Sequence, residues 1–235
     1  MAIASAMGCG IPKCCKMRIQ FDLLEELFCS TDFNLLEEGE REYPLEQEIR
    51  LSRLDAKSPA VSRTATASQQ IILYSGTAET AFHGRTFRDL GLDAKSLRHI
   101  FGDDGADTPK YGLAAEDVEP WWLDLQNPSE TELRLLCAGL KIHPLTLEDI
   151  LNQEKREKIE DYTTYYYVVL SSCRVEGEEP EVEYTASNTY IIVFPTGTLS
   201  ISYAESAHPN HVLSRIERLQ DYVAINSDWI FYAFA

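Results

Sequence analysis

The stretch His143–Leu151, with the sequence HPLTLEDIL, carries the clearest local signal in this chain of 235 residues. Pro144 suits the first helical position, because its φ is already set and it lacks an N–H that would stay unpaired there. Glu148 and Asp149 follow within two turns, where the positive end of the helix dipole favours acidic side chains. Apolar residues at the i, i+3, i+4 spacing predict one buried face: Leu147, Ile150 and Leu151. The plain structural interpretation is therefore a helix carrying two solvated carboxylates.

The segment before this helix predicts a strand and a second helix. Trp121–Leu125 has the continuous apolar character of a buried strand. Ser129 and Glu132 have the spacing of a capping box, in which the serine hydroxyl accepts the N3 amide and the glutamate accepts the N-cap amide. The apolar residues that follow line one helix face: Leu133, Leu136, Cys137 and Leu140.

The segment after the helix predicts antiparallel strands. Tyr162–Arg174 is dense in tyrosine and valine, and a second strand with alternating apolar positions runs from Val182 to Phe194. Its last residues are apolar on both faces, which is typical of a central strand. A turn at Pro195–Thr198 leads into a return strand, Leu199–Tyr203, so a hairpin is expected.

Further elements are expected at both ends. Before residue 121 these are a strand at Ile71–Tyr74, a strand or turn at Phe82–Leu90, and a helix capped by Asp93. Pro209 opens a helix whose inward positions are Val212, Ile216, Leu219 and Val223, and Asp228 starts another helix. This order predicts the α/β class, with helices packed on the faces of a mixed, partly antiparallel sheet.

Residues 1–67 are expected to form an extension, poorly ordered unless it docks on the domain, with two helical turns at Phe21–Phe28 and a linker at Ser58–Gln70. Residues 68–235 form the compact domain. The six cysteines show no disulfide framework, and reduced cytosolic thiols are expected. A zinc site among the four in the extension is the alternative: Cys9, Cys14, Cys15 and Cys29.

The net charge of −17 belongs mostly to the compact domain, where 13 basic and 27 acidic residues give −14. Such a surface repels phosphate backbones and anionic membranes, which argues against nucleic-acid binding, and it attracts divalent cations. No apolar run reaches the roughly 18–20 residues of a membrane helix, and no secretory signal is present. The chain is therefore expected to be soluble and intracellular.

A succession of motifs gives the chain a family resemblance. Trp121–Leu125, Asn127–Ser129, Leu140–Leu151 and Arg156–Tyr162, in this order, resemble the cytoplasmic domain of the CorA family of magnesium transporters, above all its fungal members. The resemblance spans about residues 68–235 and is strongest from Trp121 to Leu170. It implies a three-layer α/β/α sandwich, truncated before the family's stalk and membrane helices. The Gly-Met-Asn motif of the family's pore is not in this sequence.

The same resemblance implies a regulatory role on the cytoplasmic side of a plasma or vacuolar membrane. In the family, acids at the positions of Glu148 and Asp149 bind regulatory Mg²⁺, weakly, between the subunits of a homopentamer; other divalent ions are alternatives. Adjacent helical residues point about 100° apart, so a second chain must complete such a site. The implied partners are other protomers, and the membrane is reached only through helices beyond residue 235. A pore-less partner-binding or modifier subunit is the alternative function.

Other candidate sites favour structural interpretations. His143, His208 and His211 lie at helix starts, and Asp228 is a charge at a helix N-terminus. The run containing Lys155, Arg156 and Lys158 alternates with glutamates and is typical of a solvated face with weak ion pairs. The loop acids are also expected to be solvated: Asp103, Asp104 and Asp107. No catalytic motif is present, so an enzyme is not expected, and an α/β enzyme would need a deep polar pocket.

Overall fold

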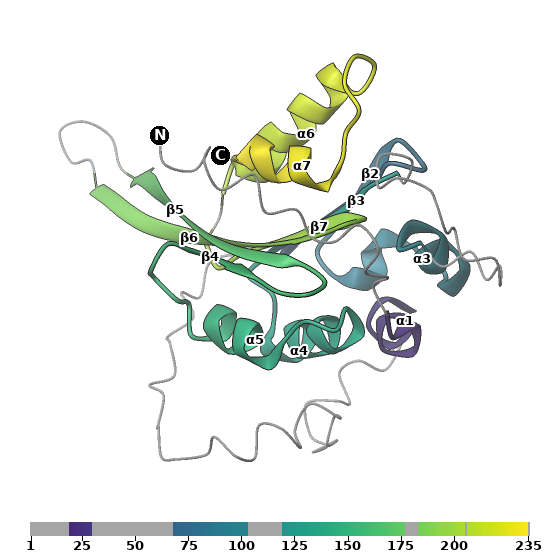
Figure 1. Cartoon of the computed structure of the whole chain (residues 1–235), viewed down its shortest axis with the longest axis horizontal. Coiled ribbons are helices and arrows are strands. Elements are labelled where there is room, and N and C mark those ends of the chain that lie inside the picture. The colour runs from purple at the N-terminus through teal and green to yellow at the C-terminus, as the bar shows by residue number, and fades with distance from the viewer. Residues whose placement is uncertain (1–18, 30–67, 103–118, 177–182, 205, 235) are drawn as a thin grey trace.

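The computed structural model describes residues 19–29, 68–102, 119–176, 183–204 and 206–234. Within these ranges a seven-stranded sheet has the order β2-β1-β3-β7-β6-β5-β4. Figure 1 shows helices on both faces of this sheet. The predicted α/β class and three-layer α/β/α arrangement are therefore confirmed.

The strands combine two kinds of pairing. Their bounds are β1 (Gln70–Ser75), β2 (Thr80–Gly84), β3 (Trp121–Gln126), β4 (Lys158–Asp161), β5 (Tyr166–Glu176), β6 (Glu183–Phe194) and β7 (Gly197–Ser202). The β3–β7 pair is parallel, and the other neighbouring pairs are antiparallel. The expected hairpin joins β6 to β7, and β6 lies in the interior of the sheet, as its apolar residues predicted.

The helices divide between two hydrophobic cores. One face of the sheet carries α1 (Phe21–Cys29), the 3₁₀ helix η3 (Phe87–Leu90), α3 (Ala94–Ile100), α4 (Glu130–Gly139) and α5 (Pro144–Leu151). The other face carries α6 (His208–Leu219) and α7 (Ser227–Phe234). Residues of β3 alternate between the two cores, because successive side chains of a strand point to opposite faces. Trp121 and Leu123 join the core of α1 and α4, whereas Trp122 joins that of α6 and α7.

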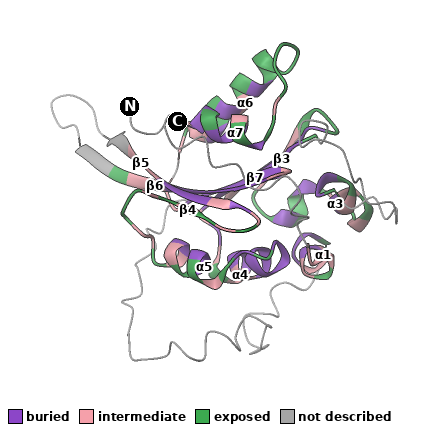
Figure 2. Ribbon diagram, viewed as in Figure 1, coloured by how far each residue is buried: buried purple, intermediate pink, exposed green. Residues whose placement is uncertain are grey.

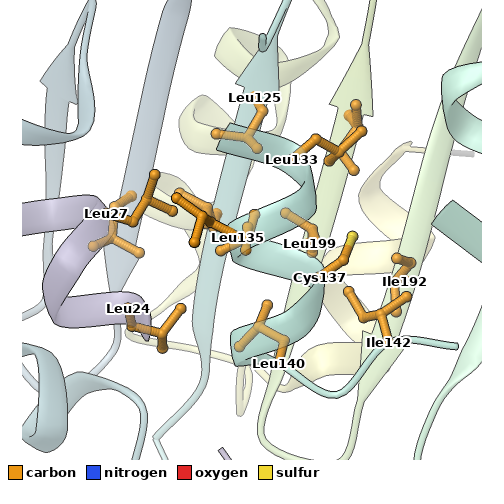
Figure 3. Close-up of a cluster of buried hydrophobic side chains, with 14 of the residues drawn as sticks. Leu24, Leu27, Leu125, Leu133, Leu135, Cys137, Leu140, Ile142, Ile192 and Leu199 are labelled. Carbon is orange, nitrogen blue, oxygen red and sulfur yellow. The ribbon is translucent and has the colours of Figure 1, made fainter. Parts of the chain in front are cut away.

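Helix α1 packs directly on the compact domain. Leu24, Leu27 and Phe28 are buried in the same core as the apolar face of α4, as Figure 3 shows for the two leucines. The backbone N–H of Gln20 also donates to the carbonyl of Gly139 at 2.8 Å. The helix predicted at residues 21–28 is thus confirmed. The rest of the predicted extension lies outside the described residues, so the boundary at residue 67 stays a prediction.

Two predicted helix starts have the expected capping geometry. The Asp93 carboxylate accepts the N–H of Ser96 at 2.8 Å at the start of α3. At α4, Ser129 Oγ accepts the N–H of Glu132 at 3.2 Å, and the Glu132 carboxylate accepts the N–H of Ser129 at 2.8 Å. The second arrangement is the predicted capping box.

The start of one strand and the buried face of one helix were predicted wrongly. The strand expected at Tyr162–Arg174 begins only at Tyr166, because residues 162–165 form a turn after β4. In this turn the backbone N–H of Tyr162 donates a hydrogen bond to the carbonyl of Tyr165. The expected inward face of α6 holds for Val212 and Ile216, but Leu219 and Val223 are exposed. The helix ends at Leu219, and its outer end is exposed in Figure 2.

Several sequence predictions fall outside the described part of the chain. They concern Cys9, Cys14 and Cys15, the loop acids Asp103, Asp104 and Asp107, and most of the linker. Cys137 is buried, as predicted. Among the described residues, the longest helix is α6, with 12 residues, and no helix combines the length and apolar character that crossing a membrane requires.

Candidate functional site

Helix α5, which carries Glu148 and Asp149, begins as its sequence predicted. His143 is the N-cap, with its Nδ1 atom accepting the N–H of Leu145 at 3.2 Å, and Pro144 follows in the first turn. Leu147 and Ile150 are buried in the core beneath the sheet. The structural role expected for His143 at a helix start is therefore confirmed, and it is that of a cap.

A buried tyrosine fixes the start of this helix. The Tyr165 hydroxyl accepts the backbone N–H of His143 at 3.0 Å and forms a hydrogen bond with Thr146 Oγ1, also at 3.0 Å. The Tyr165 side chain is buried, and burial raises its pKa to about 12. It therefore stays neutral near pH 7 and keeps its donor.

We expect Tyr165→Phe to loosen α5. Removing the hydroxyl leaves the Thr146 side chain and the His143 N–H without this partner, and a buried polar group left unpaired costs about 1–3 kcal/mol. Urea unfolding should report a free energy of unfolding lower by that amount. Tyr222→Phe is the matched control, because Tyr222 is 83% exposed. Equal stability of the two variants would contradict the role given to Tyr165.

The two acids of the predicted metal site have different surroundings. Glu148 is exposed on the outer side of α5 and makes no ion pair within the described residues. Asp149 is half-buried, and its Oδ2 atom lies 2.6 Å from the ammonium nitrogen of Lys158. Of these two acids, therefore, Glu148 is the one whose carboxylate is open to an external cation in this structure.

Lys158 links α5 to the edge strand β4. Its ammonium also lies 2.9 Å from Glu160 Oε1, and the Tyr162 hydroxyl donates to Glu160 Oε2 at 3.2 Å. Burial opposes the charged ammonium, but hydrogen bonds and charges from Asp149 and Glu160 outweigh this effect, so the pKa of Lys158 is raised. Lys158 is accordingly a cation at any ordinary pH.

The residues present fit a divalent ion only in part. Mg²⁺ prefers oxygen ligands and retains several waters, so one exposed carboxylate per chain suffices as a contribution to a shared site. Glu148 meets this requirement, whereas Asp149, as it stands, is neutralised by Lys158. Within the described ranges, no group of three or more histidine, cysteine or acidic side chains is arranged to hold a metal. The acid pair therefore makes no complete site in one chain.

The remaining candidates have structural contacts. Asp228 lies in the first turn of α7 and accepts a hydrogen bond from the Tyr166 hydroxyl at 2.8 Å. His208 begins α6, and its N–H donates to Ser206 Oγ at 3.2 Å. Neither His208 nor His211 belongs to a metal-binding group among the described residues.

Lys158 and Glu160 are the site residues that sequence reasoning missed. Their run was predicted to be a solvated face, but they lie on an edge strand with their side chains turned toward α5. The signal that could have found them is the alternation of charged residues 158 and 160 with Ile159, which is the period of a strand.

A cavity of about 300 Å³ opens near β5 and β6, at the lower end of the size range of small-molecule pockets. It is lined by Gln153, Lys155, Ser171, Ala186, Ser187, Asn188, Tyr190, Tyr203 and Ala204. None of these lining residues is a carboxylate or a histidine.

Comparison with known proteins connects this fold to ion transporters. Residues 119–235 match the family model described as CorA-like Mg²⁺ transporter protein. The Schizosaccharomyces pombe protein C27B12.12c, whose name assigns it provisionally to metal ion transport, is 32% identical over 201 residues, covering 84% of this chain and 23% of the relative. Magnesium transporter ALR2 of Saccharomyces cerevisiae is 41% identical over 123 residues, covering 52% of this chain and 14% of the relative.

A solved structure gives a more distant match. The CorA magnesium transporter from Methanocaldococcus jannaschii is 13% identical, with a TM-score of 0.41 over 70% of this chain and 42% of that chain. The chain spans about a quarter or less of the length of the two yeast relatives. Through residues 119–235, which match the family model and carry the motifs of the sequence resemblance, this chain belongs to the CorA-like Mg²⁺ transporter family.

Proposed function

We propose that this chain is the cytoplasmic regulatory and assembly domain of a CorA-type divalent-cation transporter. The observation that carries the proposal is the match of residues 119–235 to the family model, since the relatives ALR2 and C27B12.12c are named for magnesium and metal ion transport. Other copies of the same chain are the proposed partners, in the pentameric arrangement that the resemblance implies.

Charge supports a role in cation sensing. Copies of a domain with a net charge of −14 repel one another when they are brought together, and divalent cations reduce such repulsion. Glu148 is the proposed ligand, because its carboxylate is exposed on α5. Asp149 is the second proposed ligand, available only when Lys158 releases it. The ion would supply positive charge between neighbouring copies. It favours the associated state of the copies only if it binds that state more tightly than the separated state.

The test is a thermal unfolding titration of the whole chain with MgCl₂, against NaCl at matched ionic strength. At an ion concentration tenfold above Kd we expect a stabilisation of about 1.4 kcal/mol, which is about 3–6 °C in Tm for a chain of this size. Glu148→Gln should abolish this shift, because it removes the exposed ligand.

Glu217→Gln is the matched control, because Glu217 is also an exposed helical glutamate but lies on α6, in the opposite layer. It should keep the full Mg²⁺ response. Sedimentation of the same samples would show whether the ion promotes association of copies. An absent Mg²⁺ response, or identical responses of the two glutamine variants, would refute Glu148 as the sensor.

A further inference from the structure

Helix α1 is anchored on the domain by side chains that reach three other elements (Figure 1). Leu24 lies against Gly139 at the end of α4, and the Phe28 ring packs edge-on against Phe87 of η3, with ring centres 4.7 Å apart. The Phe28 ring centre is also 6.3 Å from that of Phe101, directly after α3. Residues four apart lie on one helix face. Helix α1 therefore presents one row of anchors to a groove formed by α3, α4 and η3, which we call the α1 groove.

Gly139 is the point at which α4 makes room for α1. Beyond its own helix, the atoms nearest to a β-carbon added at Gly139 are Leu24 Cδ2 at 2.6 Å, Leu24 Cγ at 3.1 Å and the Gln20 carbonyl oxygen at 3.6 Å. All three belong to α1 or to the residue directly before it. The Gln20 N–H also donates to the carbonyl of Gly139 at 2.8 Å. A larger side chain at position 139 would therefore obstruct α1 before any other part of the fold.

The charges of α1 and α3 are complementary. Helix α1 has three acidic side chains and no basic one, whereas α3 has two basic side chains, Lys95 and Arg98, and no acidic one. Glu25 Oε1 accepts hydrogen bonds from Nε and Nη2 of Arg98 at 3.0 and 2.8 Å. The guanidinium carbon of Arg98 lies 4.9 Å from the centre of the Phe21 ring. The α1 groove thus suits a helix with an apolar face and an acidic flank.

The connection between α1 and the sheet is long enough to reach another molecule. The 40 residues 30–69 join α1 to β1. A chain of this length can span up to about 130 Å, whereas a domain of this size has a radius of gyration of about 15 Å. The free energy of closing such a loop also changes only slowly with its length. Chain length therefore does not restrict α1 to the groove of its own molecule.

We propose that α1 is an exchangeable docking helix, which enters the α1 groove of a neighbouring copy of this chain as well as its own. Its contacts are the same in both arrangements, so exchange between copies loses no buried surface, hydrogen bond or ion pair. At nine residues α1 is shorter than helices that are stable alone in water. It therefore depends on a groove, and it leaves one favourably only by entering another.

Exchange would link copies in a defined direction. The helix of one copy and the groove of the next form a head-to-tail contact, which closes into a ring when the rotation between copies permits it. This inference deepens the assembly role proposed above, and it rests on that role because copies must lie close together for exchange to compete with docking in one chain. It assigns the contact between copies to α1, and it requires no metal ion.

Two full-length variants with complementary defects test the exchange. Leu24→Asp has an intact groove but an α1 that cannot dock without burying an unpaired charge. Gly139→Leu has an intact α1 but an obstructed groove, and leucine favours a helix more than glycine does, so α4 is not weakened. Neither variant alone has both halves of the contact. A mixture has both, because the helix of Gly139→Leu fits the empty groove of Leu24→Asp.

The measurement is co-purification of differently tagged chains mixed in EDTA. Burial of one leucine corresponds to at least about tenfold in affinity, so recovery from the mixture should exceed that of each variant with its own tagged copy by at least this factor. Hydrogen exchange should be fast in α1 of both variants alone and should slow in the mixture for the helix of Gly139→Leu. A mixture of folded variants that forms no complex would overturn the proposal.

A second pair of variants changes only the surface and decides the question if the core variants do not fold. Glu25→Arg and Arg98→Glu each place like charges together when α1 docks in its own chain, and only exchange restores an opposite pair in their mixture. Both side chains are partly exposed, so the buried anchors stay intact. The mixture should show about two- to tenfold more co-purification than either variant alone.

Glu130→Arg and Arg134→Glu are the matched control. Their ion pair lies within α4, so mixing the two variants cannot restore it between chains and should bring no gain. Equal co-purification in the two mixtures would show that α1 does not exchange. Because every mixture contains EDTA, that result leaves the Mg²⁺ response tested at Glu148 unaffected, and the two ideas fail independently.

Discussion

The wild-type chain is expected to become less stable as the pH rises from about 4 to about 7, and the Asp124→Asn variant is expected to remove most of this pH dependence. Asp124 lies on the interior strand β3 and is 1% exposed. Its Oδ1 atom accepts a hydrogen bond from Ser200 Oγ at 2.5 Å, but Oδ2 has no partner among the described residues. Burial raises the pKa of Asp124 to about 7, although the hydrogen bond from Ser200 and the nearby Gln126 side chain offset part of this effect.

The direction of this change in stability with pH follows from proton binding to Asp124. The ordinary pKa of 3.8 applies to the unfolded chain, so between pH 4 and pH 7 the folded state binds more protons at Asp124 than the unfolded state does. Stability therefore falls as the pH rises through this window and levels off above it. A difference of about three pKa units corresponds to a loss on the order of 4 kcal/mol, which is a large part of the usual stability of a domain.

Urea unfolding at several pH values from 4 to 8 measures this contribution as the difference between wild type and variant. The asparagine resembles the protonated acid, so the variant should become the more stable chain above pH 7. Asp221→Asn is the matched control, since Asp221 is exposed and its neutralisation should leave the slope unchanged. Parallel stability curves for wild type and Asp124→Asn would show that Asp124 titrates normally in the fold.

Local signals predicted most of the fold. The capping box at Ser129 and Glu132 and the proline at the start of α5 act within a few residues, so their geometry could be predicted from neighbours in sequence. The strand β4 was missed because its alternating charges resemble a solvated run, and only pairing with β5 shows that it belongs to the sheet. The apolar period of α6 also predicted too much burial, because the helix ends at Leu219 and Val223 lies beyond it.

The candidate site was less predictable than the fold because its charges are paired by tertiary contacts. Glu148 and Asp149 are neighbours in sequence, yet only Asp149 meets Lys158, and this contact depends on how the chain returns from α5 into β4. Asp124 illustrates the same limit. An acid within the apolar stretch Trp121–Leu125 indicates a buried charge, but its hydrogen-bond partner Ser200 lies 76 residues away in sequence.

The Gly197→Ala variant is expected to be among the most destabilised single variants of this domain. Gly197 begins β7 and lies opposite Trp121 of β3 in the parallel pair. A β-carbon at position 197 would overlap the ring-fusion carbons and the ring nitrogen of the Trp121 indole. The indole is 1% exposed and packs against Phe101 and Phe194, with ring centres 4.7 and 5.7 Å away. It therefore has no free space into which it could move.

The expected cost is at or above the upper end of the 1–3 kcal/mol range for overpacked cores. Gly102→Ala is the control for the general effect of replacing a glycine. There is open space where the added methyl group of this control would lie, but the φ of Gly102 is 89°, so its cost of roughly 1–2 kcal/mol comes from backbone strain alone. Chemical unfolding of both variants at one pH compares the two costs, and Gly197→Ala should be the larger.

A double-mutant cycle with Trp121→Phe tests the cause. The smaller ring leaves a cavity when it is introduced alone, but in combination with Gly197→Ala it also removes the overlap, so the double variant should be more stable than the sum of the two single costs predicts. Coupling energies between contacting residues are about 0.5–3 kcal/mol, and a value near the top of that range is expected here. Additive costs would mean that Gly197 is required for a reason other than the Trp121 ring, since removing the bulky partner would then bring no relief.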